Sequence, residues 1–334
     1  MTERLIARIT GIGSYLPERV LTNSDLEKMV ETSDEWIVSR TGMRERRVAA
    51  IDEFTSDMGA KAASQALLNA ELTSNDIEMI IVATMSPDYI SPSTANIIQA
   101  KIQANHAAAM DIQAACSGFL YGLSLAKAYV ESGMYQNVLV IASEKMTAFV
   151  DYQDRSSCVL FGDGAAAVVV SNKKTGLAIE TICLGADGQL ADLVIIPAGG
   201  SRHPASTETV EKKLHYFKMS GKEVFKHAVR RMTAAARECL TKANLTESDI
   251  SWLIPHQANE RIISAIAKQF SMTEKQVYKK TLPKYGNTSA SSVAIALDEL
   301  LQEEEIQKGE HLLLVAFGGG LTWGATILTK IVEV

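Results

Sequence analysis

Two stretches of the chain, AASQALLNAELTSNDIEMIIV at residues 62–82 and AARECLTKANLTESDISWLIP at residues 235–255, decide the fold. Each reads as an Ala/Leu-rich amphipathic helix, a Thr-x-x-Asp turn and a short aliphatic strand. They stand 173 positions apart, and eight of the sixteen positions in 62–77 are identical to their counterparts. The same offset aligns LVIAS at 139–143 with LLLVA at 312–316, which favours an internal duplication over chance similarity.

The duplication predicts two related halves, residues 1–173 and residues 174–334, each built on the same supersecondary plan. Helix and strand signals alternate through both halves, a pattern typical of an α/β protein in which parallel sheets are covered by helices.

Charge and cysteine usage exclude several classes of protein. The chain has 33 basic and 39 acidic residues, a net charge of −6, which argues against bulk nucleic-acid binding. No apolar run approaches the roughly 20 residues of a membrane helix, and the charged N-terminus is unlike a signal peptide. The four cysteines contain no CxxC pair, so we expect reduced thiols in a cytoplasmic protein rather than a disulfide framework or a metal site.

Cys116 has the sequence context of a nucleophile. It lies in DIQAACSGFL (111–120), where a strand pattern gives way to the apolar-faced helix pattern that follows. The unpaired amides and dipole of a helix N-terminus favour a thiolate, and lowering the thiol pKa to about 7 would make half of it anionic. Small neighbours would let a substrate approach. The alternative is a buried structural thiol, the interpretation that we give to the other three cysteines, Cys158, Cys183 and Cys239.

Three further segments supply groups that a thiolate needs for catalysis. The offset of 173 sets Cys116 against Ser289 in YGNTSASSVAIALDELL (285–301), so two equivalent helix N-termini are expected to meet between the halves. His256 follows an apolar strand, where open α/β sheets place ligands, and Asn287 lies in a Gly-Asn-Thr-Ser loop. The glycines of AFGGGLTWGA (316–325) predict backbone close to the site, able to donate N–H groups.

Taken together, these segments resemble the β-ketoacyl-acyl carrier protein synthase III family, which starts bacterial type II fatty acid synthesis. The resemblance extends over residues 11–325 and is carried by DEWIVSRTGMRERR, DIQAACSGF, VLFGDGAAAVVV, MSGKEVFK, IPHQANERI, KYGNTSASS and FGGGLTWG. It implies a thiolase-like fold with a five-layer α-β-α-β-α arrangement, usually in a homodimer.

The resemblance also implies a mechanism and a set of catalytic positions. Cys116 matches the residue that attacks a short acyl-CoA primer and becomes acylated before malonyl-acyl carrier protein condenses with it. His256 and Asn287 match the residues that hold the malonyl thioester oxygen, and the N–H groups of Cys116 and Gly319 match the oxyanion hole. No cofactor is implied, because CoA enters as part of the substrate.

Binding positions are carried over in the same way. Trp36 and Arg155 match the pair that sandwiches the CoA adenine, with Thr32, Arg40 and Asn259 as further CoA contacts. The carrier-protein surface is matched by Lys226, Gln257, Ala258, Asn259, Glu260, Arg261 and Lys268. Glu260 departs from the aliphatic residue common at its position. Lys222, Lys226 and Arg230 are also spaced to share one helix face.

Ser91 departs from the family pattern in a way that bears on specificity. In DYISPST (88–94) it replaces the phenylalanine that limits the primer pocket across the dimer in well-studied members. A smaller side chain predicts a roomier pocket that tolerates branched or longer primers.

Other functions remain open from the sequence. An enzyme of the same fold that makes a polyketide or alkylquinolone precursor would use the same three catalytic residues, and a catalytically silent binding module is the non-enzymatic alternative. A thiolase would need a second catalytic cysteine in a suitable context, plant-type chalcone synthases are longer, and no Gly-x-Ser-x-Gly indicates a serine hydrolase.

Overall fold

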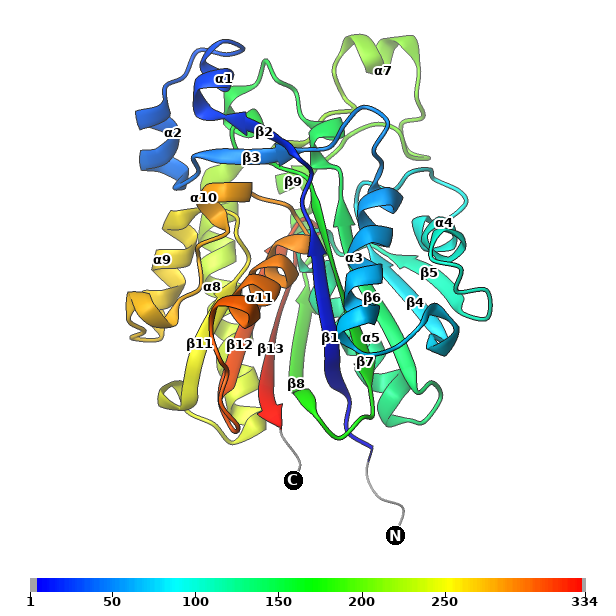
Figure 1. Cartoon of the computed structure of the whole chain (residues 1–334). Helices are drawn as coiled ribbons and strands as arrows, with labels where there is room; N and C mark the ends of the chain where they lie inside the picture. Colours follow the sequence, from blue (N-terminus) through cyan, green and yellow to red (C-terminus); the bar gives the residue numbers. More distant parts are fainter. Residues whose placement is uncertain (1–4, 332–334) are drawn as a thin grey trace.

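In the computed structural model, residues 5–331 are described. Nine of their strands form one continuous mixed sheet with helices on its faces, and two further sheets have two strands each (Figure 1). Within these residues the strand order is β11-β12-β13-β8-β1-β7-β6-β4-β5. The strands are β1 (Arg8–Tyr15), β4 (Met79–Ala83), β5 (Ala108–Ile112), β6 (Asn137–Glu144), β7 (Gly164–Ser171), β8 (Gly176–Ala186), β11 (Ile250–Pro255), β12 (His311–Gly318) and β13 (Thr322–Ile331). Only two residue pairs join β1 to β8, so the sheet consists of an N-terminal part and a C-terminal part linked at one point.

Helices cover both parts of the sheet and also fill the space between them. The helix α3 (Thr55–Asn69) packs on the outer face of the N-terminal part, and α8 (Gly221–Ala243) packs on the outer face of the C-terminal part. Between the two parts lie α5 (Gly118–Glu131) and α11 (Ser291–Glu303), each of which contacts strands of both. Three apolar cores separate these layers, which confirms the predicted α-β-α-β-α order.

The repeated segments form the predicted units. α3 is followed by the turn η1 (Ser74–Asp76) and β4, and α8 is followed by η5 (Glu247–Asp249) and β11. In both turns the threonine and the aspartate form a capping box, Thr73 with Asp76 and Thr246 with Asp249. The Thr-x-x-Asp signature therefore ends one helix and starts the next strand in each half, because its side chains satisfy the exposed amides of the turn.

The expectation of parallel sheets is confirmed only for some of the strand pairs. β4 pairs in parallel with β5 and β6, and β11 pairs in parallel with β12, but β7 and β13 run antiparallel to their neighbours. A short connection at residues 319–321 joins β12 to β13, and such a connection can only produce an antiparallel pair.

Smaller elements build a cap over one end of the sheet. In Figure 1 the cap is formed by β2, β3, α1 and α2, which lie over α9 and α10. Arg46 of β3 fastens it: its buried guanidinium donates to Asn23 Oδ1 (2.7 Å) and to Val159 O (2.6 Å). The remaining elements are β2 (Arg19–Thr22), α1 (Asn23–Glu27), α2 (Asp34–Thr41), β3 (Glu45–Val48), α4 (Thr94–Lys101), η2 (Ala115–Ser117), η3 (Met146–Phe149), α6 (Arg155–Cys158), η4 (Gly188–Leu193), β9 (Val194–Ile195), α7 (Thr207–Glu211), β10 (Lys218–Met219), α9 (Glu260–Gln269), η6 (Glu274–Gln276) and α10 (Leu282–Tyr285).

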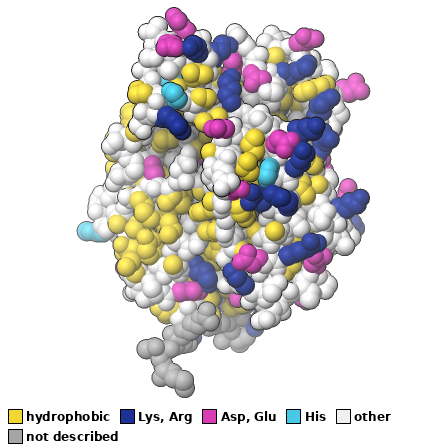
Figure 2. Space-filling model, turned by 180° about the vertical axis from the view of Figure 1, so that it is seen from behind, with side chains coloured by type: hydrophobic (Ala, Val, Ile, Leu, Met, Phe, Trp, Pro, Cys, Tyr) yellow, Lys and Arg dark blue, Asp and Glu magenta, His cyan; other side chains and the backbone are white. Residues whose placement is uncertain are grey.

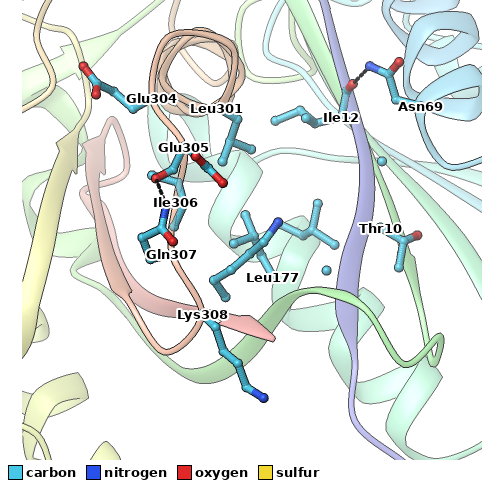
Figure 3. Close-up of a pocket in the computed structure, with 14 residues that line it drawn as sticks. Thr10, Ile12, Asn69, Leu177, Leu301, Glu304, Glu305, Ile306, Gln307 and Lys308 are labelled. Carbon is cyan, nitrogen blue, oxygen red and sulfur yellow. Dashed lines mark hydrogen bonds between the residues drawn. The ribbon is translucent and has the colours of Figure 1, made fainter. Parts of the chain in front are cut away.

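The opposite end of the molecule, where β1 begins and β13 ends, carries an open groove (Figure 3). Its walls come from β1, the start of β8 and the segment after α11, and they mix apolar residues such as Ile12 and Leu177 with Glu304 and Lys308. None of the predicted site residues lines this groove. Among residues 5–331, no helix has both the length and the apolar character needed to cross a bilayer.

Candidate active site

Cys116 lies in the turn η2, between the end of β5 and the start of α5, as the sequence predicts. The end of β12 presses against this turn, because a Cβ atom on Gly318 would come within 2.6 Å of Cys116 N. This contact is the close backbone approach that the glycine run of residues 318–320 predicts. Only 9% of Cys116 is exposed.

His256 follows the last residue of β11 and is held at both its backbone and its ring. Its N–H donates to Val315 O (2.8 Å), and its Nδ1 lies 2.5 Å from Ser292 Oγ. Ser292 Oγ also accepts the N–H of Gln257 (3.3 Å), so the hydroxyl proton is available for Nδ1. This arrangement favours the tautomer that carries its proton on Nε2. Burial lowers the pKa of His256 to about 3, so the imidazole is neutral at pH 7.

Asn287 is oriented by the loop before α11. Its backbone N–H donates to Leu160 O (2.8 Å), and its carbonyl accepts from Gly162 N (3.1 Å). Its side-chain Oδ1 accepts the N–H of Ser289 (2.8 Å). Because the oxygen is used in this way, the amide nitrogen is the group left to donate to a ligand.

One cavity brings the three predicted catalytic side chains together. Cys116, His256 and Asn287 line it, together with Gly319. The rest of its wall is largely apolar and includes Phe161, Phe217, Met219, Val224, Met232 and Phe317. A thiol, an imidazole N–H and an amide N–H therefore face one water-poor space, in which hydrogen bonds to a developing oxyanion are strong.

Burial works against the thiolate that the sequence context of Cys116 favours. Burial raises the pKa of Cys116 to about 12; the Ser289 hydroxyl lowers it and the nearby Glu144 carboxylate raises it further, but neither outweighs burial. The helix N-terminus is in place, yet desolvation of the anion exceeds its effect. The sequence indicates the helix N-terminus that favours the anion, but not the depth at which the sulfur lies, and burial at that depth raises the pKa.

Three polar residues of the site were not predicted as part of it. Cys116 Sγ lies 3.5 Å from Ser289 Oγ, and Ser289 Oγ donates to Glu144 Oε1 (3.0 Å). Ser292 supports His256 as described above. The offset of 173 had already placed Ser289 opposite Cys116, and it is the signal that could have identified this contact. Glu144 lies at the end of an apolar strand, and nothing in its local sequence indicates its position under the cysteine.

The predicted CoA residues lie on the cap or in contact with it: Thr32, Trp36 and Arg40 belong to the cap, Arg155 to α6 and Asn259 to the start of α9. Trp36 of α2 has the guanidinium groups of Arg155 and Arg40 over its ring, at 4.7 Å and 4.9 Å from the centroid. Thr32 precedes this helix, and its Oγ1 is buried without a partner. Asn259 caps α9 and donates to Arg40 O (3.0 Å), so it joins the cap to the His256 loop.

The predicted carrier-protein residues divide into two groups. Lys226 on α8 and both Arg261 and Lys268 on α9 are exposed, and Figure 2 shows Lys and Arg gathered on the side of the molecule where these helices lie. Glu260 is partly buried and pairs with Lys279 (2.7 Å), while Ala258 lines the cavity. Gln257 must be withdrawn as a docking contact, because it is 1% exposed and its amide donates to Pro255 O and Tyr278 O.

Ser91 lies away from the cavity of its own chain. It belongs to an exposed loop between β4 and α4, next to Tyr89 and Ile90, which are 62% and 90% exposed. Because Ser91 does not line the cavity, any effect on a primer pocket requires a second copy of the chain, as the resemblance implies.

The other three cysteines do not line the cavity. Cys158, Cys183 and Cys239 are free and buried, as expected for structural thiols. Within residues 5–331 there is no group of three or more His, Cys, Asp or Glu side chains with the arrangement of a metal site.

Comparison with known proteins gives a consistent result along the chain. Family profiles described as 3-oxoacyl-[acyl-carrier-protein] synthase III match residues 110–188, and those of its C-terminal region match residues 240–330. A relative named β-ketoacyl-[acyl-carrier-protein] synthase III, from Chlamydia trachomatis serovar D, is 59% identical over 97% of this chain and 99% of its own.

Two solved structures resemble the whole chain. That of 3-oxoacyl-[acyl-carrier-protein] synthase III from Aquifex aeolicus has a TM-score of 0.89 at 45% identity and covers 97% of this chain and 100% of its own. The structure of the priming β-ketosynthase of the R1128 polyketide pathway has a TM-score of 0.90 at 36% identity, and the match covers 99% of this chain and 98% of that one.

Proposed function

This chain belongs to the β-ketoacyl-[acyl-carrier-protein] synthase III family, and we propose that Cys116, His256 and Asn287 carry out its reaction. It is an acyltransferase that condenses an acyl-CoA with malonyl-acyl carrier protein and so initiates fatty acid synthesis. The products are 3-ketoacyl-acyl carrier protein, CoA and CO2.

The first half-reaction transfers the primer to the enzyme. Cys116 attacks the thioester carbonyl of a short acyl-CoA, and CoA leaves as the acyl-Cys116 intermediate forms. The backbone N–H groups of Cys116 and Gly319 stabilise the oxyanion of the tetrahedral intermediate, a contribution of about 3 kcal/mol per donor. The position of Gly319 in the wall of the cavity that Cys116 also lines supports this assignment.

The second half-reaction forms the carbon–carbon bond. Malonyl-acyl carrier protein loses CO2, and the Nε2–H of His256 and the amide of Asn287 donate to the thioester oxygen as enolate character develops. A neutral imidazole suits this role because it donates a hydrogen bond without releasing its proton, and the low pKa of His256 keeps it neutral. The carbanion then attacks acyl-Cys116 and releases the thiol.

The proposal also assigns the binding residues. CoA is bound by Trp36, Arg155, Arg40, Thr32 and Asn259, and the acidic carrier protein docks on Lys226, Arg261 and Lys268.

Assembly and location are part of the same proposal. The exposed Ser91 loop supports a homodimer in which this loop borders the partner's primer pocket. The free buried thiols support a cytoplasmic location, and the turn between β7 and β8 supports a boundary between the halves at residues 173 and 174. No cofactor is needed beyond the CoA of the substrate.

The observation that carries the proposal is the single cavity lined by Cys116, His256 and Asn287. Incubation with acetyl-CoA should add one acetyl group per chain, which mass spectrometry of proteolytic peptides should locate on Cys116. The Cys116→Ala variant should take up none. An acyl group on another residue would overturn the assignment.

The alternative is a priming enzyme of polyketide synthesis, and it is favoured by the likeness to the R1128 enzyme. The identity of 59% to the chlamydial relative favours fatty acid synthesis. The test is a competition in which the acylated enzyme is offered the malonyl-carrier protein of fatty acid synthesis together with that of polyketide synthesis. We expect the higher kcat/KM for the carrier protein of fatty acid synthesis. A higher kcat/KM for the polyketide carrier protein would identify a polyketide enzyme.

A further inference from the structure

Glu144 is a fully buried carboxylate to which the mechanism above gives no role. It ends β6, and its residue exposure is 0%. Its oxygens accept hydrogen bonds from Ser289 Oγ (3.0 Å), Thr84 Oγ1 (3.1 Å), Ser86 Oγ (2.5 Å) and the N–H groups of Met85 and Ser86 (3.1 Å each). A loop after β4 and the loop before α11 thus converge on one acid.

The donors around Glu144 are all neutral. Within the described part of the chain, no lysine or arginine forms an ion pair with it. Burial therefore outweighs the hydrogen bonds and raises the pKa of Glu144 to about 7. A carboxyl group with this pKa gains and loses a proton readily at neutral pH, as a general base requires.

Ser289 connects this acid to the nucleophile. The Cys116 thiol donates to Ser289 Oγ (3.5 Å), and the Ser289 hydroxyl donates to Glu144 Oε1 (3.0 Å). Both bonds run in the same direction, from the sulfur to the carboxylate. Ser289 N–H also holds the side chain of Asn287 (2.8 Å), so one residue contacts the nucleophile, the acid and an oxyanion donor.

The thiol of Cys116 needs such an acceptor. With its pKa raised to about 12, it must lose its proton as it attacks. His256 is a poor recipient, because its buried imidazole resists a positive charge and its Nδ1 is already bonded to Ser292. Glu144 can accept the proton without creating a new charge, since its carboxylate becomes a neutral acid.

We propose that Glu144 accepts the proton of Cys116 through the Ser289 hydroxyl during acylation and returns it when the thiol is released. The inference rests on the proposed role of Cys116 as the acylated nucleophile. Ser289 and Glu144 are positioning and proton-transfer residues that act through Cys116, and neither touches the substrate in this scheme.

The proton balance of the cycle closes. As the Sγ–carbonyl bond forms, the thiol proton moves to Ser289 Oγ and the Ser289 proton moves to Glu144. The bond to the CoA sulfur breaks with its electron pair, and the CoA thiolate is protonated by solvent. After decarboxylation, the carbanion attacks acyl-Cys116 and expels the thiolate, which recovers its proton from Glu144 through Ser289.

Few other charged groups lie close enough to Glu144 and Cys116 to affect their titration. The loop after β4 presents hydroxyls and amides to Glu144, and the loop before α11 presents the Ser289 hydroxyl. The turn before α5 presents the Cys116 thiol, which is the titratable partner. On β6 itself, the ammonium group of the neighbouring Lys145 is directed to Ala50 O and Glu53 O.

The test is the pH dependence of single-turnover acylation by acetyl-CoA, followed by mass spectrometry between pH 5.5 and 9.5. For the wild-type protein, we expect the rate to rise through about pH 7, with the ionisation of Glu144, and then to level. For Ser289→Ala we expect a rate at least tenfold lower at pH 7 that still rises at pH 9.5, because the thiol must then ionise alone. Glu144→Gln should behave in the same way.

Control variants distinguish the proton relay from a general effect of removing a buried hydroxyl. Ser291→Ala removes a buried hydroxyl from the same turn, one that is bonded to Thr288 O (2.9 Å), and it should keep the wild-type profile. If Glu144→Gln does not fold, Ser289→Ala decides the question. A wild-type rate and profile in Ser289→Ala would overturn the relay while leaving Cys116 acylated. Absence of acylation at Cys116 in the wild-type protein would instead overturn the proposed function.

Discussion

The guanidinium group of Arg155 lies 4.7 Å from the centre of the Trp36 ring, although the two residues belong to different helices, α6 and α2. Arg155 also donates to Glu31 O (2.8 Å), which fixes it beside the start of α2. An adenine stacked between the two planes would need roughly 7 Å, twice an ordinary contact distance of about 3.5 Å. CoA binding at this point therefore requires Arg155 to move away from the ring.

Replacing Trp36 with alanine should weaken acyl-CoA binding. Loss of one stacked aromatic face is worth about 1–2 kcal/mol, so we expect the KM for acetyl-CoA to rise about tenfold with little change in kcat. The matched control is an acetyl thioester of pantetheine, which lacks the adenine and should keep its wild-type KM. Equal effects on both substrates would show that Trp36 supports the fold of the cap and does not bind the adenine base of CoA.

The two half-reactions should separate when His256 is replaced by alanine. Acetyl-CoA should still label Cys116, because the oxyanion donors of that step are backbone groups. Condensation with malonyl-acyl carrier protein should fall by at least a hundredfold, the usual cost of one oxyanion donor. Mass spectrometry and release of CO2 from labelled malonyl-acyl carrier protein measure the two steps. Condensation at the wild-type rate would contradict the role given to His256.

Carrier-protein docking should depend on the exposed cation Arg261. Because the carrier protein is acidic, Arg261→Glu replaces attraction with repulsion, and we expect the KM for malonyl-acyl carrier protein to rise at least tenfold, with a smaller ratio at high salt. Lys308→Glu is the control, since it makes the same charge change in the groove at the far end of the molecule. A similar rise in both variants would mean that net charge, rather than this surface, controls recruitment.

Much of the fold follows from short-range patterns that appear twice. Thr73 and Thr246 each form a capping box with the aspartate three residues later, so the repeated turns could be predicted from sequence spacing alone. The sheet direction could not, because it depends on which strands become neighbours. β7 returns beside β1 and β6, and no local signal specifies that antiparallel pairing.

The site shows the same division between position and environment. Cys116, His256 and Asn287 follow a strand end or precede a helix, and these positions are visible in the sequence. The burial that raises the pKa of Cys116 could not be predicted, because the desolvation of a thiolate depends on long-range packing. Glu144 and Ser292 were missed for a related reason: a carboxyl group at the end of a strand or a hydroxyl at the start of a helix gives no indication of its partner in the fold.

In the proposed homodimer, the exposed loop that carries Ser91 should set primer size in the partner's pocket. If the partner's pocket is roomier because Ser91 is small, the wild-type protein should accept isobutyryl-CoA and octanoyl-CoA, and Ser91→Phe should restrict it to acetyl-CoA. A tenfold or greater change in the ratio of kcat/KM values is expected, since a blocked pocket excludes the longer chain sterically. Ser93→Ala, a small change in the same loop, is the control. Unchanged primer preference in Ser91→Phe would reject the idea.

The buried imidazole of His256 should make the protein less stable in acid. Its pKa is about 3 in the folded protein against 6.5 for an ordinary histidine, so below pH 6.5 the unfolded chain binds a proton that the folded chain does not. Stability is thus present above pH 6.5 and is lost by about 1.4 kcal/mol per pH unit on acidification, or about 2 kcal/mol by pH 5. Urea unfolding of wild-type protein and His256→Asn at pH 7.5 and pH 5.0 measures this contribution. The raised pKa of Glu144 acts in the opposite direction but is common to both proteins, so it cancels in the difference. The wild-type protein should lose about 2 kcal/mol relative to the variant over this range, and identical pH dependence in the two would mean that His256 is protonated in the folded state.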